Sequence, residues 1–128
     1  MRLGGCGWGL VFGVGLMSQA AFGVSLSASL KNYYAEYEIV LQCKAQAQLS
    51  PGDADAAGAA MAKIEAYYLK RDASLDKDRL SKQAVADKND SFKIVARSGS
   101  SGLRPYCRMS LNELLIKARD VDGGSTAQ

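Results

Sequence analysis

Residues 50–70 read SPGDADAAGAAMAKIEAYYLK, and this segment carries the most clearly marked helix start in the chain. Ser50 suits an N-cap, Pro51 suits the first helical position because no amide proton is needed there, and Asp53 suits the third. Apolar side chains then recur at helical spacing: Ala57, Met61, Ile64 and Tyr68. The small residues from Ala56 to Ala60 would let a neighbouring helix approach closely. We therefore expect an α-helix that ends near Lys70 and packs against other helices.

Helices are also predicted on both sides of this segment. Residues 26–49 place apolar side chains three and four residues apart: Leu30, Tyr33, Tyr34, Tyr37, Val40 and Leu41. A last helix is expected to carry Cys107, Leu111, Leu114, Leu115 and Ala118 on one face. Ser110 and Glu113 form a capping-box pattern that would start or restart this helix after Pro105.

The region between residues 72 and 106 is less regular. Asp72-Ala73-Ser74 indicates a break, after which Ser74 or Asp76 would cap a third helix. The polar run from Asp87 to Ser91 is expected to be a loop or exposed turn before a short segment containing Phe92, whose surroundings favour helix. The predicted fold is all-α, a small irregular bundle of four to five helices in residues 24–120, followed by a disordered tail at 121–128.

Residues 1–23 have the pattern of a secretory signal peptide. A positive start at Met1-Arg2 precedes an uncharged apolar run, and small residues follow, with cleavage expected after Ala20 or Gly23. We therefore expect a periplasmic protein that is not attached to the membrane after cleavage. The mature chain would retain two cysteines, Cys43 and Cys107, which in an oxidising compartment are most simply a disulfide, although two separate buried thiols remain an alternative.

The composition argues against several kinds of chemistry. The chain contains no histidine, so the usual general base and the usual metal ligand are missing. The Asp53-x-Asp55 pattern places Ile64 where a calcium loop needs a bidentate acid, so no metal site is expected. The net charge of +3 is too small to indicate nucleic-acid binding. We expect a binding protein without catalytic residues or cofactors.

Five tyrosines form an unusual cluster along two predicted helices: Tyr33, Tyr34, Tyr37, Tyr67 and Tyr68. Adjacent helical residues cannot both face inward, so one member of each neighbouring pair should lie nearer the surface. The cluster is either the edge of the core or a contact surface, because tyrosine suits both places.

The order of these features resembles the type VI secretion amidase immunity proteins. The resemblance rests on Asn32 to Tyr37 leading to Cys43, on Asp53 to Ala60, and on Leu103 to Cys107 followed by Ser110-Leu111-Asn112-Glu113-Leu114. It implies a periplasmic helical protein, frequently a homodimer, that binds a peptidoglycan amidase effector. It also implies inhibition by a protruding element placed in the active-site cleft of the amidase.

The predicted partner-binding segment is the one internal stretch without packing side chains, Ser98-Gly99-Ser100-Ser101-Gly102, flanked by Arg97 and Arg104. Such composition indicates a flexible surface loop, narrow enough to enter a cleft, while the two guanidiniums would bind carboxylates at its rim. A passive linker is the alternative interpretation of this segment. The leading alternative function is a periplasmic chaperone or stress-response binding protein.

Overall fold

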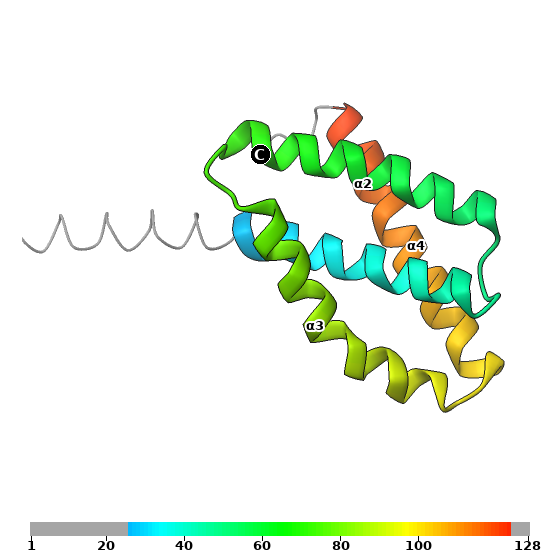
Figure 1. Ribbon diagram of the computed structural model, residues 1–128. Helices are drawn as coiled ribbons and strands as arrows, with labels where there is room; N and C mark the ends of the chain where they lie inside the picture. Colours follow the sequence, from blue (N-terminus) through cyan, green and yellow to red (C-terminus); the bar gives the residue numbers. More distant parts are fainter. Residues whose placement is uncertain (1–25, 124–128) are drawn as a thin grey trace, which may run out of the picture.

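The computed structural model describes residues 26–123, which form four α-helices joined by short turns (Figure 1). The first helix spans residues 26–45 and is followed by α2 (Pro51–Arg71), α3 (Lys77–Ala96) and α4 (Ser100–Gly123). The all-α prediction is confirmed. The predicted signal peptide at residues 1–23 lies outside the described residues.

The first helix is the central element of the bundle. In Figure 1 it lies between α2 and α3, with α4 crossing behind it. Its contacts reach all three: the Tyr34 hydroxyl donates to Glu65 on α2, Gln42 donates to Asn89 on α3, and Cys43 is bonded to Cys107 on α4. Its buried residues are distributed around the helix, as expected for a helix packed against several neighbours: Leu30, Tyr34, Ala35, Ile39, Val40 and Cys43.

The start of α2 is built as the sequence predicts. The Ser50 side chain accepts a hydrogen bond from the Asp53 amide at 3.0 Å, and the Asp53 carboxylate accepts one from the Ser50 amide. This capping box satisfies amide groups that have no partner within the helix. The core face of α2 comprises Ala54, Ala57, Ala60, Met61, Ile64 and Tyr68, and it packs extensively along α4.

The turn between the first helix and α2 is a Schellman motif. The amide of Gln48 donates to the carbonyl of Cys43, and the amide of Ala47 donates to the carbonyl of Lys44. Ala47 takes the left-handed position with φ of 58°, where glycine is more usual. The first helix therefore ends four residues before the expected boundary at Leu49.

The structure corrects the prediction of a polar loop at residues 87–91, because α3 continues without interruption from Lys77 to Ala96. The N-cap of α3 is Asp76, one of the two residues that the sequence offers for this position. The Asp76 side chain accepts a hydrogen bond from the Arg79 amide. Only Leu80, Ala84 and Phe92 of α3 are buried. A helix at the edge of a bundle needs only a narrow apolar stripe, so its polar run lies on the solvent side.

The predicted flexible loop from Ser98 to Gly102 is also corrected. Residues 97–99 form the turn, while Ser100, Ser101 and Gly102 already belong to the first turn of α4. Ser110 and Glu113 therefore do not start a helix: Ser110 lies buried in the middle of α4. At the other end α4 continues through Gly123, three residues into the predicted tail, and residues 124–128 lie outside the described range.

The Cys43–Cys107 disulfide is present, as predicted, with 5.9 Å between the two Cα atoms. Both cysteines are completely buried in the core. No helix among residues 26–123 is both long and apolar enough to cross a membrane.

Candidate interaction surface

The sequence-predicted site residues all lie at one end of the bundle, where α3 turns into α4. We call residues 97–104 the corner. Arg97, Ser98, Gly99, Ser100, Ser101 and Arg104 are exposed, and Gly102 is half-buried. The structure therefore brings the predicted residues together at the surface, on a tight turn and a helix start instead of on a flexible loop.

Two glycines make the corner possible for different reasons. Gly99 has φ of 76°, a left-handed conformation that costs other residues free energy, and its carbonyl accepts from the amide of Leu103 at 2.9 Å. Gly102 is needed for space: a Cβ atom there would lie 2.5 Å from the Cβ of Ser98. The chain can reverse within three residues because both positions are glycine.

The corner is held by bonds to the rest of the bundle. Cys107, on α4 just after the corner, is joined to Cys43 near the end of the first helix. The side-chain Nε2 of Gln48 donates to the Ser100 hydroxyl at 3.3 Å, and Arg108 pairs with Asp53 at 3.1 Å. The turn between the first helix and α2 therefore supports the corner from the same end of the molecule.

The corner presents positive charge to solvent. Within residues 26–123, none of the ion pairs involves Lys93, Arg97 or Arg104, all of which are exposed. A hollow between the first helix and α3 opens beside them; Phe92 lines it together with Lys93 and Arg97. Uncompensated cations at an exposed edge favour contact with carboxylates.

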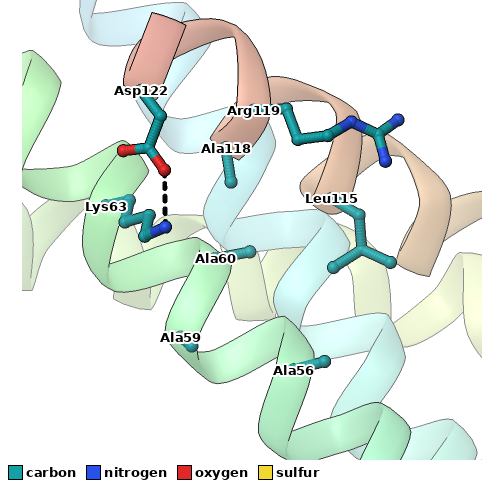
Figure 2. A pocket seen from close by; sticks show the side chains of 8 residues that line it. All are labelled: Ala56, Ala59, Ala60, Lys63, Leu115, Ala118, Arg119 and Asp122. Carbon is teal, nitrogen blue, oxygen red and sulfur yellow. Dashed lines mark hydrogen bonds and ion pairs between the residues drawn. The ribbon is translucent and has the colours of Figure 1, made fainter.

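A groove between α2 and α4 is a feature that the sequence interpretation missed (Figure 2). Its volume is about 320 Å³, and it is lined by Ala56, Ala59, Ala60, Lys63, Leu115, Ala118, Arg119 and Asp122. Figure 2 shows Lys63 and Asp122 paired across one end, with the Arg119 side chain extending outward from α4. The groove forms because α2 offers only alanine methyl groups opposite Leu115.

The tyrosine cluster is mainly structural. Tyr34 and Tyr68 are buried, whereas Tyr33 and Tyr67 lie nearer the surface, as the sequence predicts for adjacent pairs. The ammonium group of Lys117 lies 5.5 to 5.8 Å from the ring centres of Tyr33, Tyr67 and Tyr68, a cation–π arrangement that ties α4 to the first helix and α2. Most of the aromatic surface is used inside the molecule.

The electrostatics of this cluster follow from burial and nearby charge. Burial, together with the negative charge that Tyr68, Glu113 and Asp120 can carry, raises the pKa of Tyr33 to about 12. Burial and the 2.5 Å hydrogen bond to Glu65 raise the pKa of Tyr34 as well. Both phenols stay protonated at physiological pH, so they act as neutral donors and packing groups.

The described residues contain no group of three or more acidic or cysteine side chains placed to hold a metal ion. What the surface offers instead is a rigid cationic corner and an apolar groove. The residues that form the groove have a recognisable pattern in the sequence. The small residues Ala56 and Ala59 flank the core positions of α2, and Leu115 flanks the core positions of α4.

Comparisons with known proteins identify no relative. The chain matches no family model, no curated protein and no solved structure.

Proposed function

We propose that this protein is a periplasmic immunity protein that binds and inhibits a type VI secreted peptidoglycan amidase. In this proposal the corner occludes the active-site cleft of the amidase, and the protein acts by binding alone, without turnover of its own. The observation that carries the proposal is the shape of the corner: small exposed residues at a tight turn, flanked by two guanidiniums that form no ion pair within residues 26–123 and held in place by a buried disulfide.

The disulfide supports both the location and the mechanism. Disulfides persist in oxidising compartments such as the periplasm, which agrees with the signal-peptide pattern of residues 1–23. Because the corner is held in place before binding, it loses little conformational entropy in the complex. More of the free energy of its contacts therefore contributes to affinity. The tip residues Ser98, Gly99 and Ser100 have small side chains, which suits entry into a narrow cleft.

The charges suggest how the tip would be held. Arg97 and Arg104 stand on the two sides of the turn, where planar guanidiniums can form paired hydrogen bonds with carboxylates at the rim of a cleft. Because neither side chain has an ion-pair partner within residues 26–123, no internal bond must be broken to make these contacts.

The test is inhibition of a purified type VI peptidoglycan amidase from the same organism, measured on peptidoglycan fragments. The mature protein should inhibit it, and the double charge reversal Arg97→Glu/Arg104→Glu should weaken inhibition at least about tenfold, which is about 1.4 kcal/mol. The matched control, Lys70→Glu/Lys82→Glu, makes the same charge change at exposed sites away from the corner and should inhibit normally.

Absence of inhibition by the mature protein would contradict the proposal. Suppression of the aggregation of unrelated unfolded proteins, without any effect on the amidase, would favour the chaperone function. Thermal melts of both double variants should match the unsubstituted protein, which shows that changes in inhibition do not come from unfolding.

A further inference from the structure

The backbone hydrogen bonds of α3 and α4 meet at one residue of the corner, Gly99. Its amide donates to the carbonyl of Ala96 at 3.1 Å, as though α3 continued, and its carbonyl accepts from the amide of Leu103 at 2.9 Å, as part of α4. Arg97, the C-cap of α3, still has helical dihedral angles. The reversal of the chain therefore depends on the left-handed conformation of Gly99.

An opened corner, in which α3 and α4 form one straight helix, is compatible with the rest of the molecule. In Figure 1 the corner lies at the edge of the bundle, so a helix that continues straight from α3 leaves the bundle without meeting another element. The amides of Ser100 and Ser101 donate to no backbone carbonyl within residues 26–123. In a straight helix both would donate to carbonyls four residues earlier, so opening gives partners to amides that the closed turn leaves to solvent.

An opened α4 must find a surface that fits its core face. This face is apolar and includes Leu103, Cys107, Leu111 and Leu114, all buried against the other helices. Leaving it in water would cost the packing of α4 along α2 and the first helix. A second copy of this chain has the complementary surface, because every contact that α4 makes in its own bundle can be made in the bundle of an identical chain.

We propose that two copies of this chain exchange α4 by opening the corner. In the exchanged dimer α3 and α4 of each chain form one helix, and each α4 packs on the first helix, α2 and α3 of the partner chain. Helix α3 offers little resistance to opening, because only three of its residues are buried and it packs far less on α4 than α2 does. The exchange goes beyond the proposed function and does not depend on it. It bears on that function because residues 97–104 lie within a helix in the dimer, which therefore has no corner.

The disulfide determines whether an exchanged dimer persists. Cys43 precedes the corner in the chain and Cys107 follows it, so in the exchanged dimer each bridge joins the two chains. With glutathione disulfide as the oxidant, the two protein thiols transfer two protons and two electrons, their S–S bond forms, and the S–S bond of the oxidant breaks to give two glutathione thiols. The chemistry is the same within one chain and between two. Oxidation therefore locks the arrangement that the reduced chains have adopted.

Two substitutions at Gly99 test whether the chain opens there. Gly99→Ala disfavours the left-handed turn about tenfold and favours the straight helix roughly fivefold, and both effects act at each of the two corners that open. The reduced mature protein is equilibrated, oxidised with glutathione disulfide and run on non-reducing gels. Gly99→Ala should become half dimeric at a protein concentration at least about a hundredfold below that of the unsubstituted protein. Gly99→Asn is the matched control and should dimerise no more than the unsubstituted protein, because asparagine tolerates the left-handed conformation.

A mixture of two single-cysteine variants tests the exchange without altering the corner. Cys43→Ala retains Cys107, and Cys107→Ala retains Cys43, so in the mixture a Cys43–Cys107 bridge can form only between chains. Both side chains are completely buried in the closed bundle, so folded chains bring them together only when α4 is exchanged. Mass spectrometry of non-reduced peptides should show this bridge in clear excess over the amount that random pairing gives, because oxidation traps each exchanged pair as it forms.

The outcomes separate this proposal from the proposed function. Absence of the excess Cys43–Cys107 bridge would overturn the exchange, and this test decides alone if Gly99→Ala does not fold. A folded Gly99→Ala that dimerises no more than Gly99→Asn would also overturn it. The locked dimer should not inhibit the amidase, because it has no corner. Inhibition equal to that of the monomer would contradict the proposed role of the corner and leave the exchange standing.

Discussion

Helices α2 and α3 are almost equal in length, 21 and 20 residues, yet they are held in the bundle very differently. Six residues of α2 are buried against its neighbours, and α2 packs along most of α4. Only three residues of α3 are buried; α3 packs far less on α4, and it meets α2 at its first residue, through the Lys77–Glu65 ion pair at 3.8 Å. Two helices of nearly equal length therefore differ in role: α2 belongs to the core, and α3 lies on its edge.

The corner joins the weakly packed α3 to the well-packed α4. Because α3 cannot fix its position, the corner depends on bonds to the rest of the bundle. It begins at the end of the weakly packed α3 and ends in the firmly packed α4. The disulfide, the Gln48–Ser100 hydrogen bond and the Arg108–Asp53 ion pair all act on the α4 side of the turn. The position of the corner is therefore set by α4 and the first helix. The weakly packed α3 contributes little to fixing it.

The disulfide should provide the largest single stabilisation of the well-packed region. Replacing both Cys43 and Cys107 by alanine frees a loop closed over 64 residues, which the chain-entropy model values at about 4 kcal/mol. We expect a loss of that size in the free energy of unfolding, measured by urea denaturation. A loss below about 1 kcal/mol would show that packing alone holds the first helix on α4.

Core truncations should separate the two regions. Ile64→Ala, at a completely buried α2 position, should cost about 3 kcal/mol of global stability. Leu80→Ala on α3 should lower global stability less, because α3 can open locally while the rest stays folded. Hydrogen exchange should then rise within residues 77–96 alone; an equal rise along α2 and α4 would contradict the comparison.

The corner itself should be sensitive to a single methyl group. Gly102→Ala places a Cβ against that of Ser98, so the turn must shift, at a cost of about 1 to 2 kcal/mol in unfolding free energy. The double variant Ser98→Gly/Gly102→Ala removes the opposing atom and should recover part of this loss. No recovery in thermal melts would mean that the contact does not limit the turn.

The smallest effect is expected from alkaline pH, and it acts on the well-packed region. Because the pKa of Tyr33 rises from 10.0 to about 12 on folding, its contribution is complete below pH 10 and is lost as pH rises from 10 to about 12. Solvent screening of a half-exposed ring limits the change to roughly 1 kcal/mol. The Tyr33→Phe variant should lose less stability between pH 10 and about 12 than the unsubstituted protein. An identical loss would show that ionisation of Tyr33 is not its cause.

The sequence predicted the helices whose ends and faces are chemically distinct. The capping box at Ser50 and Asp53 marks α2 at its start, and the apolar periodicity of Leu111, Leu114 and Ala118 marks the core face of α4. The disulfide followed from the two cysteines and the expected compartment. These features depend on local chemistry, which a single sequence displays directly.

The incorrect predictions depend on contacts between distant residues. The run from Asp87 to Ser91 is polar because α3 lies at the edge of the bundle, and its position at the edge is a tertiary fact. Residues 100–102 are helical because Leu103 is buried and Gly102 packs closely on Ser98. The groove beside Leu115 also depends on how α2 and α4 face each other, so composition alone did not reveal it.

Hydrogen exchange of the complex tests the central claim most directly. The mature protein is compared alone and with an excess of the purified amidase, and amide protection is mapped along the chain. The account predicts new protection in residues 97–104, at the turn between α3 and α4. Protection confined to the outward faces of α2 or α3, with residues 97–104 exchanging as in the free protein, would contradict it.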